Sequence, residues 1–220
     1  MSILIATPCY GGMASTQYLR SCLALQEEFQ RAGVDHDWLL MENESLIQRA
    51  RNNICRSFLA DTPLEKLLFI DADIEFRPEH VAALWNLQAE VAVGIYAMKK
   101  PDQDVYAAWV NGQLVKELDG LPVPVNLDFA GTGFMMIDRS ALLKMRAAWP
   151  EREHVEAGPH AGELAQSFEW FSPRVIQDET GNWYASEDYA FCYDWRSLGG
   201  EVVCDPWVRL IHHGSYAYGR

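Results

Sequence analysis

The chain has 220 residues, 49% of them hydrophobic and 22% charged, which fits one globular domain with a sizeable core and excludes a largely disordered chain. Acidic residues outnumber basic ones by 31 to 18, for a formal net charge of −13, and this balance disfavours general binding to phosphate backbones. The five cysteines are widely spaced and form no C-x-x-C pair, so neither a disulfide framework nor a cysteine zinc site is indicated.

Strands and helices alternate over the first hundred residues, which implies a parallel sheet with helices on both faces. The N-terminal run MSILIATPCYGG lacks a basic n-region and is too short for a membrane span, so we expect a cytoplasmic protein. The expected elements are strand 2–8, a helix carrying Tyr18, Leu19, Cys22, Leu23, Leu25 and Phe29 that ends near Gly33, strand 37–42, helix 45–60 after Ser45, strand 66–76, helix 78–88 and strand 90–98.

The pattern changes after residue 100. Asn111-Gly112 joins two runs of period 2 and predicts a β-hairpin. Residues 126–145 predict a strand leading into a helix, and residues 149–185, rich in Pro, Gly, Trp and Phe, predict a long loop with short pieces of structure. The expected elements that follow are helix 187–198 and strand 201–205.

Two aspartates, Asp71 and Asp73, directly follow the apolar run KLLFI. The D-x-D spacing also occurs at residues 35–37 and 102–104, but only the triplet at 71–73 ends an apolar strand, and ligands of open α/β sheets bind just beyond strand ends. On an extended backbone residues i and i+2 face the same way, so we expect both carboxylates to meet one cation, Mn2+ or Mg2+. The alternative is a solvated strand end without a cation.

Arg51 falls inside the apolar stripe of helix 45–60, between Ile47, Ile54 and Phe58. An inward guanidinium stays charged and therefore needs an anionic or carbonyl partner. That partner is either a structural carboxylate or part of a ligand, such as a phosphate or a nucleobase carbonyl, and both alternatives stay open.

Glu187 and Asp188 stand at the start of helix 187–198. Acidic residues suit the first turn of any helix because of the helix dipole, which accounts for Glu187. Asp188 lies on the same side of the helix as Phe191 and Trp195, so we expect it to face the interior. Burial would raise the pKa of its carboxyl and make Asp188 a candidate general base.

Two further short motifs are candidates for ligand contacts. His212 or His213 is a candidate to complete the coordination of Mn2+, with a packed histidine as the alternative. Gly131 and Gly133 flank Thr132 in an expected strand, where the close approach of a ligand, or a bulge, would explain two glycines.

Taken in order, IATPCYGG, RARNN, FIDAD, AGTGFMMI, SEDYAFC and IHHGSYAYG resemble the nucleotide-sugar-dependent glycosyltransferases of GT-A fold. The resemblance implies one α/β domain, 1–220, with a Rossmann-like mixed central sheet flanked by helices, a nucleotide-binding half at 1–100 and an acceptor and sugar half at 101–220. It implies a D-x-D motif at 71–73 whose divalent cation bridges a diphosphate. The implied site residues are Thr7, Pro8, Tyr10, Arg51, Asn52, Asp71, Ala72 and Asp73 for the nucleotide, Asp71, Asp73, His212 and His213 for the metal, Asp188 and Glu187 for catalysis, and Gly131, Thr132, Gly133 and Trp183 for the sugar and acceptor.

The resemblance also implies a reaction. A UDP- or GDP-linked sugar would be transferred to an acceptor hydroxyl that Asp188 deprotonates, which predicts inversion and leaves retention open. Trp170, Phe171 and Trp183 are candidates for stacking on a sugar, with core packing as the alternative. The oligomeric state and the acceptor stay open, the latter being a glycan, a protein, a small molecule or a hydroxylated DNA base.

Two other functions stay open at this point. One is a nucleotidyltransferase of related fold, although the loop TPCYGGMAST lacks the Lys and Arg residues usual in that class. The other is a non-enzymatic module that binds a nucleotide or a sugar, in which Asp71 and Asp73 only end a strand.

Overall fold

The structure is a computed structural model that describes residues 1–100, 105–157, 164–179, 181–214 and 217–218. The D-x-D triplet at residues 102–104 lies outside the described residues, as do parts of the segment 149–185. No helix within the described ranges is long and apolar enough to cross a membrane.

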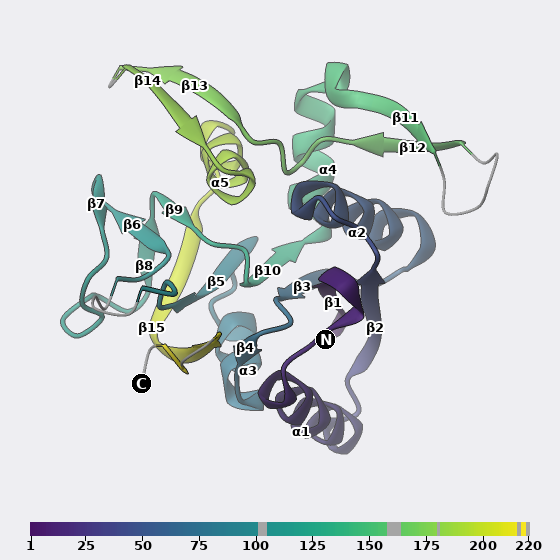
Figure 1. Cartoon of the computed structure of the whole chain (residues 1–220), viewed down its shortest axis with the longest axis vertical. Coiled ribbons are helices and arrows are strands. Elements are labelled where there is room, and N and C mark those ends of the chain that lie inside the picture. Colours follow the sequence, from purple (N-terminus) through teal and green to yellow (C-terminus); the bar gives the residue numbers. More distant parts are fainter. Residues whose placement is uncertain (101–104, 158–163, 180, 215–216, 219–220) are drawn as a thin grey trace.

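A mixed β-sheet forms the centre of the molecule (Figure 1). Two short strands, β4 (Ile74–Glu75) and β8 (Val125–Leu127), pair with β15 beside the main path. Along that path the order is β16 (Ala217–Tyr218), β15 (Val202–His213), β5 (Val91–Tyr96), β10 (Phe134–Asp138), β3 (Lys66–Ile70), β1 (Ser2–Cys9) and β2 (Asp35–Glu42).

Strand direction divides this sheet into two parallel blocks. β1 runs parallel to both β2 and β3, and β15 runs parallel to β5. Between the blocks, β10 is antiparallel to its two neighbours, β3 and β5. The mixed sheet implied by the resemblance is therefore confirmed, whereas strand–helix alternation alone predicts only its parallel blocks.

Helices cover both faces of the sheet because successive residues of a strand point to opposite sides. Leu67 and Phe69 of β3 pack in the core beneath α2, α4 and α5, and Leu68 and Ile70 pack in the core beneath α1 and α3 (Figure 1). The helices are α1 (Thr16–Ala32), α2 (Ile47–Asp61), α3 (Pro78–Asn86), α4 (Arg139–Ala148) and α5 (Glu187–Ser197).

The first two helices begin and end close to their predicted limits. Ser15 caps α1 by accepting a hydrogen bond from the Tyr18 amide, and Gly33 ends it in the left-handed conformation. Within α1, Leu19 and Leu23 are exposed, so their assignment to the buried stripe is wrong. α2 begins at Ile47, after Leu46, and not directly after Ser45.

The predicted hairpin at Asn111-Gly112 is present. It joins β6 (Ala108–Val110) to β7 (Gln113–Leu114), and β9 (Phe129–Ala130) pairs on the other side of β6. Asn111 and Gly112 both have positive φ, 52° and 74°, which the tightest hairpin turns require.

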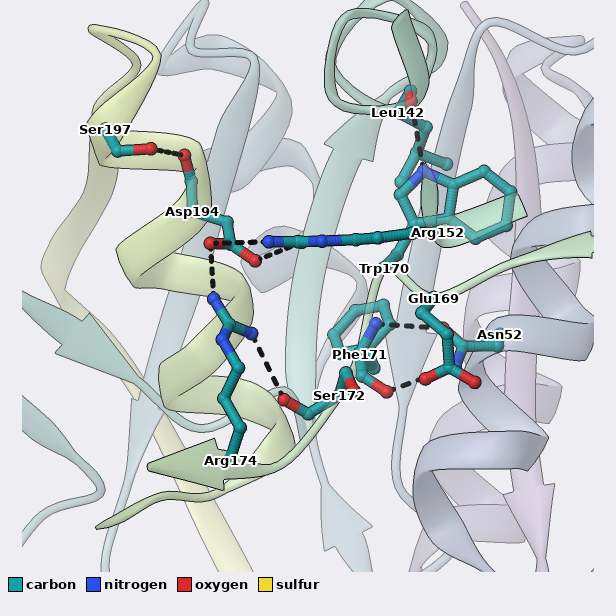
Figure 2. Close-up of polar contacts among 10 residues, drawn as sticks. All are labelled: Asn52, Leu142, Arg152, Glu169, Trp170, Phe171, Ser172, Arg174, Asp194 and Ser197. Carbon is teal, nitrogen blue, oxygen red and sulfur yellow. Dashed lines mark hydrogen bonds and ion pairs between the residues drawn. The ribbon is translucent and has the colours of Figure 1, made fainter. Parts of the chain in front are cut away.

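The segment 149–185 is more regular than the long loop with short pieces of structure that the sequence predicts, because most of its described part forms two hairpins. β11 (Glu153–Ala157) pairs with β12 (Leu164–Phe168), and β13 (Arg174–Asp178) pairs with β14 (Gly181–Ala185). The periodicity is weak because each hairpin buries few of its side chains. Asp194 of α5 contacts the start of each hairpin, through ion pairs of 2.6 Å to Arg152, just before β11, and of 2.5 Å to Arg174, the first residue of β13 (Figure 2).

Candidate active site

A cleft of about 340 Å3 lies just beyond the carboxyl ends of the neighbouring strands β1 and β3. Among the nucleotide residues expected from the sequence, Pro8, Tyr10, Asp71, Ala72 and Asp73 line it. The sequence reasoning missed the other lining residues, which are Met13, Ala14, Ser15 and Ile47.

Apolar side chains stand exposed on the rim of this cleft. Tyr10 and Met13 are 71% and 70% exposed, and Ile47 is 40% exposed. Ile47 matches the apolar period of α2 but occupies its first residue, ahead of the buried stripe that begins with Ala50. Its position at the helix start is the feature of the sequence that could have assigned Ile47 to the cleft and not to the core.

The backbone at Asp71-Ala72-Asp73 forms a tight turn held from two sides. The Ile74 amide donates to the Asp71 carbonyl at 3.1 Å. The Asp71 amide donates to the Gly133 carbonyl at 2.9 Å, and the Ser15 amide donates to the Ala72 carbonyl at 2.8 Å. The expected extended backbone is therefore absent here, and the turn gives Asp71 and Asp73 different side-chain partners.

Asp71 is paired with Arg51. The Arg51 Nη2 atom lies 3.0 Å and 3.3 Å from the two Asp71 carboxylate oxygens, and its Nε atom lies 3.8 Å from Glu187 Oε1. Arg51 is only 3% exposed, so its predicted inward position is confirmed, and Asp71 supplies the structural carboxylate that was one of its two alternatives. The Nε and Nη1 atoms are buried without a hydrogen-bond partner among the described residues.

Asp73 contacts two basic side chains. Its Oδ2 atom lies 2.5 Å from Lys99 Nζ, and its Oδ1 atom lies 3.4 Å from His212 Nε2. Burial alone would raise the pKa of the Asp73 carboxyl, but His212 and Lys99 together lower it. Lys99 was missed by the sequence reasoning, although it directly follows the expected strand 90–98, whose end reaches the same edge of the sheet.

β15 continues well past the expected strand 201–205 and brings His212 opposite Ile74, next to Asp73. His212 Nδ1 lies 3.0 Å from the Ala97 carbonyl, a contact that places a proton on Nδ1 and directs Nε2 toward Asp73. The adjacent His213 contacts Glu75 instead, at 2.6 Å, because neighbouring residues of a strand face opposite sides.

We tested whether these residues fit a divalent cation. At metal–ligand distances of about 2.1 Å, neighbouring ligands of an octahedral ion lie about 3 Å apart, so Asp73 Oδ1 and His212 Nε2 at 3.4 Å fit with a small adjustment. The Asp73 carboxylate presents lone pairs, and the neutral form of His212, protonated at Nδ1, presents one on Nε2; oxygen together with imidazole nitrogen suits Mn2+. Asp71 forms an ion pair with Arg51. The part of the chain that the structure describes contains no cluster of three or more metal-ligating side chains.

Glu187 and Asp188 are the first two residues of helix α5, and Glu187 lies near Arg51 of the Arg51–Asp71 pair. Asp188 Oδ1 accepts hydrogen bonds from the Ser186 hydroxyl and, at 2.8 Å, from the Tyr189 amide. Burial raises the pKa of Asp188 in spite of those bonds. Burial and the neighbouring Asp188 charge raise the pKa of Glu187, which Arg51 only partly offsets. The raised pKa expected for Asp188 is thus present.

Tyr96 explains the two glycines that flank Thr132. A Cβ atom at Gly131 or Gly133 would lie 2.3 Å or 2.8 Å from the Tyr96 hydroxyl oxygen, and the Gly133 amide donates to that oxygen at 3.1 Å. The close approach is thus made by a side chain of the same chain. Thr132 is buried, and its hydroxyl has no hydrogen-bond partner within the described ranges.

Two residues expected at the nucleotide have other partners. The fully buried Thr7 hydroxyl lies 2.6 Å from the Tyr18 hydroxyl. The Asn52 side chain accepts from the Phe171 amide at 2.8 Å and donates to the Phe171 carbonyl at 3.1 Å (Figure 2). We leave Thr7 and Asn52 out of the site, since the chain itself satisfies their polar groups.

The aromatic residues proposed for sugar stacking belong largely to the core. Trp170 is buried and donates its Nε1 hydrogen to the Leu142 carbonyl (Figure 2). Phe171 is buried and stacks on Phe191, with ring centroids 4.6 Å apart. For both residues the core-packing alternative holds. Trp183 is partly exposed and donates to Asp178 at 2.7 Å.

Comparisons with known proteins rest on structure. The sequence matches no protein-family model and no curated protein. The crystal structure of A197 from STIV matches with a TM-score of 0.58 and 17% identity, over 97% of this chain and 86% of that one. GalNAc-T7, crystallised with UDP, GalNAc and Mn2+, matches with a TM-score of 0.50 and 12% identity, over 96% of this chain.

The chain spans 44% of the GalNAc-T7 chain, so it corresponds to less than half of that protein. At these identities the two likenesses show the fold alone. What the chain shares with them is the overall arrangement of its fold. The chain has a GT-A-like fold, as the resemblance of its sequence motifs implies.

Proposed function

We propose that the protein is a divalent-metal-dependent glycosyltransferase that moves a sugar from a nucleoside-diphosphate sugar to an acceptor hydroxyl. The observation that carries the proposal is the Asp73–His212 pair, a carboxylate and an imidazole nitrogen 3.4 Å apart beside the strand-end cleft. GalNAc-T7, which has a similar fold, was crystallised with UDP and Mn2+. Asp73 from the first half of the chain and His212 from the second would hold Mn2+ or Mg2+.

The cleft offers a place for each part of the donor. The exposed faces of Tyr10, Met13 and Ile47 suit the flat ring of a nucleobase. Lys99 brings a positive charge beside Asp73, where a diphosphate would lie. A bound cation would neutralise the charge that develops on the leaving diphosphate.

Asp188 would act as the base. Both hydrogen bonds that it accepts go to Oδ1, which leaves Oδ2 to take the proton of the acceptor hydroxyl. The hydroxyl oxygen then bonds to the anomeric carbon as the bond from that carbon to the diphosphate breaks, with inversion. Arg51 would act as a positioning residue, because it contacts Asp71 beside the cleft and approaches Glu187 beside the base.

Thermal shift with UDP or GDP, with and without Mn2+, tests the donor and metal parts of this proposal. We expect the nucleotide to raise Tm only when Mn2+ is present, because the cation would link the diphosphate to Asp73 and His212. Asp73→Ala and His212→Ala should abolish the shift. His213→Ala is the matched control and should keep it, since His213 faces Glu75. A shift without metal, or none with either nucleotide, would contradict the proposal.

Hydrolysis of a panel of nucleotide sugars with Mn2+ would identify the donor without knowledge of the acceptor. Asp188→Asn should retain the Mn2+-dependent nucleotide shift and lose turnover, and normal turnover would remove Asp188 from the role of base. Release of pyrophosphate from a nucleoside triphosphate and a sugar phosphate would instead identify a nucleotidyltransferase. Binding of nucleotide without turnover of any donor would identify a binding module.

A further inference from the structure

Lys99 follows the end of β5 and reaches the carboxylate that the proposed cation would use. β15 lies parallel to β5, with Leu210 beside Tyr96, so the segments that follow the two strands leave the sheet at the same edge. The Asp73 carbonyl accepts from the His213 amide at 2.8 Å, which fixes the turn after β3 to the end of β15. The Lys99 side chain spans the space between these segments and places Nζ 2.5 Å from Asp73 Oδ2.

The stem of Lys99 lies against the backbone of Gly214. A Cβ atom at residue 214 would lie 3.2 Å from Lys99 Cδ, closer than most Cβ contacts in proteins. Gly214 does not adopt the left-handed conformation, so its backbone does not require a glycine. The lack of a side chain at this position instead gives the lysine stem a direct path to Asp73.

Lys99 and a bound cation would share one carboxylate. Oδ2 of Asp73 faces Lys99, whereas Oδ1 faces His212 Nε2 at 3.4 Å, and this second pair would hold the cation. Two positive charges on one carboxylate repel each other, and a divalent ion doubles the repulsion that a monovalent one would feel. The Lys99 ammonium therefore neutralises Asp73 in the metal-free protein and opposes the binding of a cation beside it.

The Lys99–Asp73 ion pair can open without disturbing the core. The two side chains are 38% and 37% exposed, and ion pairs this exposed contribute little to stability. Asp73 lines the strand-end cleft, so an ammonium released from Asp73 stays within reach of that cleft. There it can pair with an anion, such as the diphosphate of the proposed donor.

We propose that Lys99 is an internal counter-ion that holds Asp73 in the metal-free protein and passes to the donor diphosphate when the cation binds. This assignment rests on the proposed function, because it requires a cation at Asp73 and His212 and a diphosphate in the cleft. The diphosphate draws Lys99 away from Asp73, and the cation takes its place. Each ligand should therefore bind weakly alone and more tightly in the presence of the other.

The Mn2+ affinity of the full chain without nucleotide, measured from the electron paramagnetic resonance signal of free Mn2+, tests the counter-ion. We expect Lys99→Met, which keeps an apolar stem and loses the charge, to bind Mn2+ about tenfold more tightly than the wild type. Lys99→Arg keeps the charge and should retain the weak binding. Asp73→Ala, combined with Lys99→Met, should abolish the gain. Lys100→Met is the matched control and should leave the affinity unchanged, because it removes the same charge from the adjacent exposed residue.

Titration with UDP and GDP at saturating Mn2+ tests the transfer of Lys99 to the diphosphate. Lys99→Met should bind the nucleotide that stabilises the wild type about tenfold more weakly, because the diphosphate loses its cationic partner. One substitution should thus move the two affinities in opposite directions. A residue with only a structural role would not do so, since its loss would weaken the binding of both ligands.

A Mn2+ affinity of Lys99→Met equal to or weaker than that of the wild type would overturn the proposal, as would an undiminished nucleotide affinity of that variant. The outcome is separable from that of the proposed function. A Mn2+-dependent nucleotide shift in the wild type, with an unchanged Mn2+ affinity in Lys99→Met, would refute only the counter-ion. Tighter Mn2+ binding by Lys99→Met, without a nucleotide shift in any of the proteins, would refute the transferase and support Lys99 as the counter-ion of Asp73.

Discussion

Replacing Asp71 and replacing Asp73 of the D-x-D triplet should change the stability of the protein by different amounts. Asp71→Ala would remove the one ion pair closer than 3.8 Å that the described residues make with the buried Arg51 guanidinium, leaving Glu187 at 3.8 Å. We expect this variant to lose roughly 2–4 kcal/mol of unfolding free energy, since breaking a buried ion pair leaves an uncompensated charge. Asp73→Ala removes a carboxylate whose side chain is 37% exposed, so it should lose less than about 1 kcal/mol.

Urea denaturation of the two alanine variants, without nucleotide or metal, makes this comparison. In the thermal-shift assay with nucleotide and Mn2+, Asp73→Ala should be the more strongly impaired of the two variants, because it removes a proposed cation ligand. Equal losses of stability would argue against a structural role for the Arg51–Asp71 pair.

Asp188 gives the stability of the protein a pH dependence. Its folded-state pKa is raised above the ordinary value of 3.8 by burial, so the folded state holds a proton that the unfolded state has already released. The associated stability is present below pH 3.8 and is lost as pH rises through the folded pKa. Asp188→Asn, which cannot ionise, should therefore be more stable than the wild type at pH 8.

That gain should shrink as pH falls through the folded pKa of Asp188 toward its ordinary value, because the wild-type carboxyl then becomes protonated in the folded state. Denaturant midpoints of both proteins at pH 4 and pH 8 measure the difference. The Asn side chain can still accept from Ser186 and Tyr189, so hydrogen bonding is preserved. A gain that is the same at both pH values would attribute the effect to something other than ionisation.

At the scale of elements, α2 joins the cleft to the segment after β12 through adjacent residues. Arg51 contacts Asp71, and Asn52 contacts the Phe171 backbone. We expect Asn52→Ala to lose about 2–3 kcal/mol of unfolding free energy, because it leaves the Phe171 amide and carbonyl unpaired in the interior. Nucleotide affinity should stay unchanged.

Asn53→Ala is the matched control for that variant. Asn53 is the next residue of α2, and its buried Oδ1 atom has no hydrogen-bond partner among the described residues, so its removal should cost less than about 1 kcal/mol. Chemical denaturation of both variants, with a nucleotide titration of Asn52→Ala, measures the two effects. A large loss of nucleotide affinity in Asn52→Ala would return Asn52 to the nucleotide site.

Sequence patterns predict the elements that bury a whole face and miss those that do not. β3 and β5 bury nearly every side chain, and their apolar runs place them correctly. β13 and β14 bury about one residue each, and their composition resembles a loop. The pattern also ends β15 too early at Cys204-Asp205-Pro206, whereas the strand continues after a register shift and delivers His212.

The residues of the candidate site also divide into those that a local sequence pattern marks and those that it does not. Asp73, Asp188 and the inward Arg51 could be predicted from local context, because a strand end or a helix face marks each of them. The contact of Lys99 with Asp73 and that of Tyr96 with Gly131 join residues 26 and 35 positions apart. No local pattern encodes such pairs, since they depend on how β5 pairs with the rest of the sheet.

At the scale of the whole molecule, the fold lowers the reactivity of the cysteine thiols. All five are free, and four are buried. Burial raises the pKa of Cys22 to about 11 and that of Cys192 and Cys204 to about 12. Because the thiolate is the reactive form, we expect the native protein at pH 8 to react slowly with a thiol reagent such as DTNB, and the protein in guanidinium to release five equivalents rapidly.

Cys22, the least buried of the five, should be the first to react. Cys22→Ser should remove the fastest phase of native labelling and leave the count in guanidinium at four. Rapid labelling of several thiols in the native protein would contradict the packing around β1, α2, α5 and β15.

Tyr96 stands between two glycines and a proposed metal ligand. Its hydroxyl occupies the space that side chains at Gly131 and Gly133 would need, and its ring edge meets the His212 imidazole with centroids 5.1 Å apart. A methyl group added at either glycine would displace the phenol ring, which packs against the imidazole that faces Asp73. The affinity of the proposed cation site is therefore adjustable through substitutions that leave every ligand in place.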